Sequence, residues 1–305
     1  MKGYWYIKLL FVVSGIMLFV VSCGKDPTFV QGDYIYEIDD FTRVDNINGI
    51  IIHWADDMEI SEEQKKVIRD LVANMVRVDG GTFLMGAQST DAQGNNYDSD
   101  AQDNECPVHE VLLNDYYIGK FEITQREWAV IMGHNLGWSD LYGKGDDMPA
   151  YNVSWEAAIT FAERLSAMTG LSFRLPTEAQ WEYAARGASY TQYYRFSGSD
   201  DVDNVAWHNG NAGGTLHSVG EKMPNELGLC DMSGSLWEWC ADSYGPYSAD
   251  SSQDPCVVSG NPYVLRGGSW TYLPDYCRVT CRDSYDGNAV SISVGFRVSL
   301  TTINN

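Results

Sequence analysis

The sequence has few positively charged residues. Lysine and arginine number 20 in 305 residues, against 42 aspartates and glutamates. This imbalance argues against a partner that is a nucleic acid, and against docking on anionic lipid through a basic patch. It favours a soluble acidic surface, on which dense carboxylates also suit a divalent cation such as Ca²⁺.

Several catalytic motifs are missing as well. The five histidines show no metal-binding spacing such as His-Glu-x-x-His, and the chain has no Gly-x-Ser-x-Gly elbow and no phosphate-binding loop. No internal repeat or low-complexity run is present. After Gly187 no segment predicts a convincing helix, so we expect long loops whose order comes from metals or disulfides.

Residues 1–22 predict a lipoprotein signal peptide. Lys2 and Lys8 accompany an apolar run that is short for a membrane span and ends in small residues. Cys23 follows Ser22, as in a bacterial lipobox, and is the predicted lipidation site; an ordinary signal peptide or an uncleaved anchor are the alternatives. Removing the leader gives a net charge of −24, because only two lysines are lost. We therefore expect a lipid-anchored membrane protein of the cell envelope, facing the periplasm or the cell exterior.

The rest of the chain predicts a tether followed by one domain. Residues 23–60 read as a lead-in with one short strand at Ile50–Ile52, and residues 61–74 as a docking helix that Ser61 and Gln64 start with a capping box. Residues 75–300 can bury one large core. In this domain Met75–Met85 alternates around a glycine pair and predicts a hairpin, and Val111–Phe121 predicts a second strand pair.

Three further helices have readable starts. Thr124 and Thr177 each begin a capping box, and Ser154 is the N-cap of a helix that Gly170 ends. Apolar residues recur at helical spacing after each cap.

Six cysteines remain once Cys23 is set aside. Because an even number in an exported protein suggests disulfides, we expect pairing, but the sequence leaves the connectivity open. The six are Cys106, Cys230, Cys240, Cys256, Cys277 and Cys281.

Several segments resemble one family, the formylglycine-generating enzymes, also called sulfatase-modifying factors. The resemblance runs in order over about residues 75–300. Its segments are Gly80–Gly86, Phe121–Thr124, Pro149–Ser154, Arg174–Ala184, Gly228–Trp239 and Arg266–Arg297. The resemblance implies an α+β fold, a compact loop-rich variant of the C-type-lectin-like fold with low regular secondary structure and bound calcium. Trp237, Trp239 and Trp270 are expected in its core.

Calcium is expected at a tight loop around a glycine. Two carboxylates seven residues apart can share one cation with the intervening carbonyls, which suits Ca²⁺. The resemblance assigns the ligands to the side chains of Asp231 and Glu238 and the carbonyls of Gly234 and Leu236. A second site would use Asn204, the Val205 carbonyl, Asn211 and the Gly213 carbonyl. Asn211 stands where the family's enzymes can have aspartate, which would weaken that site.

The family's oxidases convert a cysteine of a sulfatase peptide to formylglycine, using O₂ and copper held by two thiolates near the chain's end. Cys277 is assigned to the first of these catalytic thiols. The second is expected five residues later, where the chain has Arg282. Cys281 comes one residue early, which in an extended strand turns its side chain to the opposite face. Copper is therefore doubtful, and a Cys240–Cys277 disulfide is a competing use, with Cys256 or Cys230 as partners for Cys281.

Two functions follow. The first is a non-oxidase lipoprotein, stabilised by calcium, that binds a protein or glycan partner in the cell envelope. The alternative is an oxidase that installs formylglycine in exported sulfatases. Arg278, Arg282 and Arg297 could hold an anionic ligand in either case, although internal pairing with carboxylates is the commoner use of such arginines.

Overall fold

The computed structural model describes residues 28–31, 34–37 and 44–301. The predicted signal peptide and Cys23 lie outside these residues. The chain divides into two compact units, Met1–Ile52 and His53–Asn305. Among the described residues, no helix combines the length and apolarity that crossing a membrane requires.

The first unit holds short strands. β1 (Thr28–Gln31) pairs antiparallel with β2 (Tyr34–Glu37), and β3 (Val44–Ile47) forms a second two-stranded sheet with β4 (Ile50–His53). The predicted strand at Ile50–Ile52 is confirmed by β4.

The second unit confirms all four predicted helix starts. Ser61, Thr124, Ser154 and Thr177 each accept the backbone N–H of the third helical residue, and three of them complete a capping box. Gly170 ends the third helix in the left-handed conformation, at φ 67°. The helices are α1 (Glu62–Ala73), α2 (Gln125–Met132), α3 (Trp155–Thr169) and α4 (Glu178–Ala185). Beyond Gly187, the described chain adds α5 (Val202–Val205) and the 3₁₀ turns η2 (Ala188–Tyr190) and η3 (Pro274–Cys277).

The predicted hairpin at Met75–Met85 is wrong. β5 (Met75–Val78) pairs with β8 (Tyr116–Gly119), and β6 (Gly81–Met85) pairs with β7 (His109–Leu113). Met75 faces Gly119 and Met85 faces His109, so both ladders keep one antiparallel register. The segment is therefore one interrupted strand, and the Val111–Phe121 segment is its interrupted partner.

This long ladder is broken in the middle, and its two halves belong to different sheets. Gly80 lies at the break, where its N–H donates to Asp115 Oδ1 at 2.8 Å. A Cβ on Gly80 would come within 2.3 Å of the Leu113 carbonyl oxygen. The glycine pair thus permits a close backbone crossing instead of a turn.

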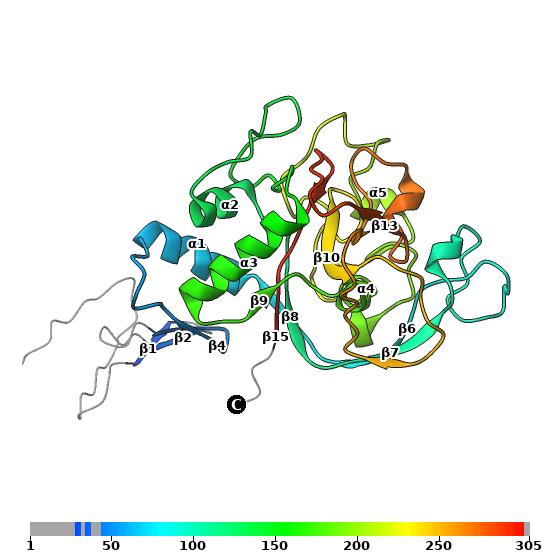
Figure 1. Cartoon of the computed structure of the whole chain (residues 1–305), viewed down its shortest axis with the longest axis horizontal. Coiled ribbons are helices and arrows are strands. Elements are labelled where there is room, and N and C mark those ends of the chain that lie inside the picture. The colour runs from blue at the N-terminus through cyan, green and yellow to red at the C-terminus, as the bar shows by residue number, and fades with distance from the viewer. Residues whose placement is uncertain (1–27, 32–33, 38–43, 302–305) are drawn as a thin grey trace, which may run out of the picture. The chain divides into compact units, whose positions relative to one another are not determined.

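Two sheets contain the two parts of this ladder, one wholly antiparallel and one mixed. One has the order β5-β8-β15-β9, and the other β11-β7-β6. A third, in the order β13-β12-β10-β14, carries the loop-rich half (Figure 1). The remaining strands are β9 (Phe173–Arg174), β10 (Trp237–Ser243), β11 (Ser252–Gln253), β12 (Tyr263–Arg266), β13 (Arg282–Tyr285), β14 (Val294–Gly295) and β15 (Ser299–Thr301), and η1 (Asp103–Glu105) lies in the loop before β7.

The core lies between these sheets and the helices. α4 is buried along its whole length, with Trp181 fully enclosed. Trp237, Trp239 and Trp270 are also buried, as predicted. In Figure 1, α1, α2 and α3 lie on one side of β10, and the β6–β7 pair on the other. The result is the expected α+β architecture with few helices.

We predict that Gly80→Ala will destabilise the domain. Overpacking of this kind costs about 1–3 kcal/mol, because the backbone around the Leu113 carbonyl must move. Urea unfolding of the chain measures the loss. Gly245→Ala is the matched control, since a Cβ there meets open space, and an equal effect of the two substitutions would contradict this account of the break.

Candidate functional site

Four arginines of the C-terminal segment are paired with buried carboxylates. Arg297 binds Glu238 through two 2.7 Å contacts, and Arg278 binds Glu105 through contacts of 2.8 and 2.6 Å. Arg266 is ion-paired with Glu182. The fourth pair joins Arg282 to Glu178. All four guanidinium groups are buried, so internal pairing is confirmed and none of them is left facing solvent for an anionic ligand.

Position 282 has a structural role. Both nitrogens of the Arg282 fork donate to Glu178 at 2.7 Å, and Nη1 donates to the carbonyls of Asn104 and Gly245. Its guanidinium carbon lies 3.9 Å from the ring centroid of Tyr247. Arg282 thus fixes the start of α4 to the loop beyond β10. The oxidase hypothesis requires a thiolate at this same position, 282.

Cys277 and Cys281 are enclosed beside it. Both are almost fully buried. Burial raises the pKa of each thiol to about 12, and the neighbouring Cys281 contributes to the shift at Cys277. The structure therefore brings the two thiols near each other but encloses both of them away from solvent. Thiolates are the form that binds copper.

The predicted Cys240–Cys277 disulfide is not formed. Cys240 lies on β10 in the main core cluster, whereas Cys277 packs with Phe196, Val205 and Ala206 in a smaller cluster. All six cysteines between positions 106 and 281 are free thiols in the structure. The disulfides expected from their even number are therefore not formed among the described residues.

The predicted calcium loop is tightly wound and buried. Asp231, Gly234 and Ser235 have left-handed backbone conformations, at φ 59°, 78° and 59°. A Cβ on Gly234 would lie 2.4 Å from the Trp207 carbonyl oxygen, so only glycine fits there. The turn brings Asp231 and Glu238 close enough that Glu238 raises the pKa of Asp231.

These carboxylates share one guanidinium. Glu122, Asp231 and Glu238 are buried around Arg297. The pKa of Asp231 is raised to about 6, mainly by burial, while the N–H of Gly220 and Arg297 act in the opposite direction. Burial, Asp231 and Glu238 raise the pKa of Glu122 well above its usual range. A single arginine does not neutralise three ionised carboxylates, so the cluster attracts a further cation or protons.

The fit to calcium at this loop is partial. Glu238 already accepts the Arg297 contacts and, on Oε2, the indole N–H of Trp181 at 2.9 Å. Asp231 Oδ2 accepts the Gly220 N–H at 2.7 Å. Among the described residues, no three His, Cys, Asp or Glu side chains meet as a metal cage. Calcium here would depend on the Gly234 and Leu236 carbonyls as well as on these two carboxylates.

At the second predicted site, Asn211 is engaged internally. Its Oδ1 accepts the His208 N–H, and its Nδ2 donates to Asp203 Oδ1 and to the Ala206 carbonyl. Asn204 accepts the Met223 N–H on its carbonyl. The side chain of Asn211 thus joins three residues of this loop through hydrogen bonds, and its oxygen is already used by the His208 N–H.

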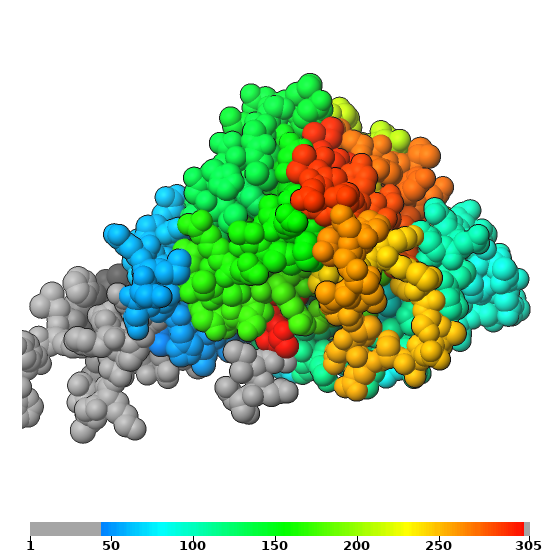
Figure 2. Space-filling model, viewed as in Figure 1, coloured from blue at the N-terminus to red at the C-terminus, as the bar shows by residue number. Residues whose placement is uncertain are grey.

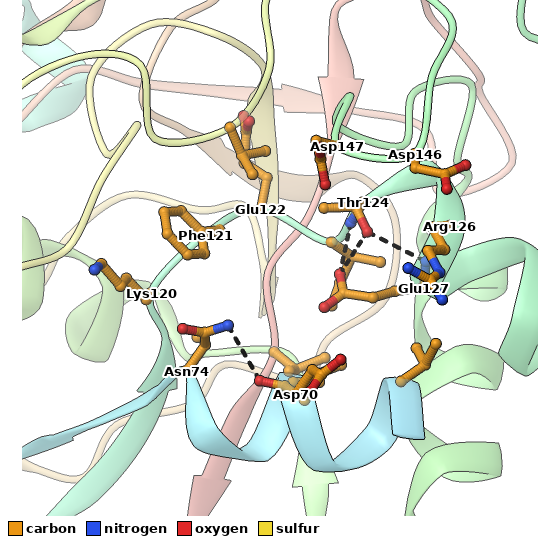
Figure 3. Close-up of a pocket in the computed structure, with 16 residues that line it drawn as sticks. Asp70, Asn74, Lys120, Phe121, Glu122, Thr124, Arg126, Glu127, Asp146 and Asp147 are labelled. Carbon is orange, nitrogen blue, oxygen red and sulfur yellow. Dashed lines mark hydrogen bonds between the residues drawn. The ribbon is translucent and has the colours of Figure 1, made fainter. Parts of the chain in front are cut away.

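A cavity of about 200 Å³ opens beside Glu122. Figure 3 shows Asp70, Asn74, Thr124, Glu127 and Asp147 around it. Glu127 accepts the N–H and the hydroxyl of Thr124 at 2.8 and 3.0 Å, and Asn74 donates to the Asp70 carbonyl. These polar groups are used in hydrogen bonds that fix the end of α1 and the start of α2. We therefore do not assign a ligand to this cavity.

Comparison with known proteins agrees with this geometry. The sequence profile of the sulfatase-modifying factor enzyme 1-like domain matches residues 60–302. The chain belongs to this family. The chain is 28% identical to the chaperone protein LppX of Paenibacillus barcinonensis, over 62% of this chain and 81% of that one. It is 29% identical to the formylglycine-generating enzyme of Streptomyces coelicolor, over 73% and 87%.

Among solved structures, the Treponema denticola variable protein 1 is similar to this sulfatase-modifying factor domain. The TM-score is 0.64 at 30% identity, covering 75% of this chain and 95% of the other. Family membership therefore rests on sequence and structure together, and the predicted family and fold are confirmed.

Glu122 is a residue of this sulfatase-modifying factor domain that sequence reasoning missed. Its carboxylate accepts the Leu236 N–H and the Ser235 hydroxyl, both at 2.8 Å. It thereby ties the loop predicted to bind calcium to the segment before α2. The Phe121–Thr124 segment already belonged to the family resemblance, but no local pattern indicates a partner more than 100 residues away.

We predict that Glu178→Gln will lower the free energy of unfolding by about 3–5 kcal/mol, because it leaves Arg282 buried without a matching charge. Thermal or urea unfolding measures the change. The control is Lys66→Gln, which removes the exposed Lys66–Asp70 pair and should cost less than about 1 kcal/mol. A small loss for Glu178→Gln would mean that Arg282 does not depend on it.

Proposed function

We propose that the chain is an exported, lipid-anchored protein whose sulfatase-modifying factor domain binds a protein or glycan partner in the cell envelope and does not oxidise thiols. The observation that carries the proposal is the state of positions 277–282. Cys277 and Cys281 are buried thiols, and Arg282, at the position expected for the second copper ligand, is committed to Glu178. A substrate thiol has no exposed pair of thiolates to approach.

The names of the relatives are compatible with both candidate functions, the binding protein and the oxidase. One is named a chaperone protein and another a formylglycine-generating enzyme. The same domain therefore occurs under names that imply different activities, and the site must decide between them. In this chain the site favours binding.

The decisive experiment incubates the mature chain with Cu(I), O₂ and a cysteine-containing sulfatase peptide. We expect no conversion of the peptide cysteine to an aldehyde by mass spectrometry, because neither thiol is available as a copper ligand. The Streptomyces coelicolor relative serves as the positive control. One bound Cu(I) per chain together with aldehyde formation would establish the alternative, an oxidase.

We also propose that calcium stabilises the loop of Asp231, Gly234, Leu236 and Glu238. The surplus of buried carboxylates around Arg297 supports this proposal. Free Ca²⁺ at a hundred times its Kd would add about 2.7 kcal/mol of stability. The melting temperature should therefore rise with Ca²⁺ and fall with EGTA, and Asp231→Asn should remove the response.

The number of ions bound then tests the second site. Two Ca²⁺ per chain by equilibrium dialysis would include the site of Asn204, Val205, Asn211 and Gly213, and one ion would restrict binding to the first loop. An unchanged melting temperature in EGTA would remove calcium from the account of stability.

The lipid anchor is tested through Cys23. We expect Cys23→Ser to move the protein from the detergent phase to the aqueous phase in Triton X-114 partitioning, because the lipid supplies the membrane affinity. The wild-type chain expressed without its first 22 residues is the control. Retention of Cys23→Ser in the detergent phase would indicate another anchor.

A further inference from the structure

A groove lined by tyrosines lies next to the C-terminal segment. It has a volume of about 580 Å³, and Tyr97, Tyr193 and Tyr194 line it together with Asp98, Arg195 and Asp200. Val279 and Thr280, from the stretch between the two enclosed thiols, form part of its wall. Figure 2 shows the loop that contains Tyr97, in cyan, against the C-terminal segment, in orange. The groove is separate from the calcium loops and from the cavity of Figure 3.

The tyrosine rings face solvent. Tyr193 is 81% exposed, Tyr97 43% and Tyr194 37%. Tyr193 also has a left-handed backbone, at φ 62°, and its N–H donates to Thr191 Oγ1. A tyrosine held outward in a costly conformation is not explained by packing, and such strain is common at binding sites.

The polar wall of the groove is fixed before any ligand arrives. Arg195 Nε lies 3.3 Å from Asp98 Oδ2, and the Arg195 N–H donates to Asp200 Oδ1 at 2.9 Å. Asp98 Oδ2 is also 3.4 Å from Arg278, which the buried Glu105 holds. The groove therefore presents carboxylate acceptors beside a guanidinium donor in positions that the core determines. Such preorganisation reduces the entropy lost on binding.

The loop that carries both Asp98 and Tyr97 is anchored just as firmly. Asn96 donates to the Leu84 and Gly86 carbonyls at 2.7 and 2.8 Å, and Gln88 exchanges backbone hydrogen bonds with the segment from Asn96 to Asp98. Tyr97 is thus carried by a loop fastened to the end of β6.

This chemistry selects a class of ligand. Flat aromatic faces suit the C–H faces of sugar rings, and adjacent acceptors and donors suit hydroxyls, which donate and accept at once. The volume falls within the range of small-ligand sites, about 300–1,000 Å³. Acidic partners on Arg195 and a net charge of −24 after removal of the leader disfavour anionic ligands.

We propose that the tyrosine groove binds a neutral oligosaccharide. The inference rests on the proposed function and makes it more specific, since it names the glycan and its site.

The test measures binding of maltohexaose, cellohexaose, chitohexaose and mannohexaose to the mature chain by isothermal titration calorimetry. We expect at least one to bind, and Tyr193→Ala and Tyr97→Ala each to weaken it about tenfold, equivalent to about 1.4 kcal/mol. Tyr190→Ala is the matched control, because Tyr190 is 62% exposed outside the groove. It should leave the affinity unchanged. All three substitutions are at exposed rings, and equal melting temperatures confirm folding.

Salt dependence separates a glycan from a basic peptide. The affinity for a neutral sugar should be the same at 50 and 500 mM NaCl, whereas binding of hexalysine would collapse with screening. Failure of all four sugars to bind at millimolar concentration overturns the proposal, as does hexalysine binding that depends on Tyr193. Oxidation of the sulfatase peptide's thiol would instead refute the proposed function. A partner that binds the Tyr193→Ala variant as tightly as the wild type would support the proposed function but contradict this site.

Discussion

The structure depends on buried arginine–carboxylate pairs that close its loop-rich half. Glu178 is the most connected of the carboxylates: it accepts both nitrogens of the Arg282 fork, lies 3.3 Å from Arg266 and accepts the Tyr247 hydroxyl at 3.0 Å. Its own N–H donates to Asp242. One residue at the start of α4 thus holds three segments that are far apart in the sequence.

Such pairs replace the regular ladders that most domains use for order. Removing charges from water is costly, so a buried pair stabilises the fold only where its geometry is good and its remaining hydrogen-bonding groups are filled. Arg297 shows this completeness, since it also donates to the carbonyls of Gly119 and Cys230. Loops without helices can therefore remain fixed while the described cysteines stay unpaired.

What the sequence could predict follows from the range of the interactions. The helix starts at Ser61, Thr124 and Thr177 depend on residues three positions apart, so a local pattern is sufficient. The strands of Met75–Met85 were also visible, but their pairing was not. A glycine pair between two alternating runs predicts a turn. The glycines are needed instead because the backbone at Gly80 passes close to the Leu113 carbonyl of the paired strand, which the sequence does not show.

The site shows the same limit. The arginines near the C-terminus suggest internal pairing, yet Glu105 and Glu178 as partners of Arg278 and Arg282 could not be chosen from many acids in so acidic a chain. The disulfide prediction failed for a related reason. The parity of the cysteines predicted only that disulfides exist, and the Cys240–Cys277 pairing came from the family resemblance. Pairing requires Cα atoms within about 7 Å, and Cys240 and Cys277 belong to different clusters.

The same frame separates stability from recognition. Arg278 is held inside by Glu105, but it also contacts Asp98, whose other partner, Arg195, is on the groove wall. The core thereby sets the position of polar groups at the surface without exposing its own charges. The exposed rings of Tyr97 and Tyr193 take no part in that network, so they can change without loss of the ion pairs. A domain built in this way can enclose its arginines and still hold polar side chains in fixed positions at its surface.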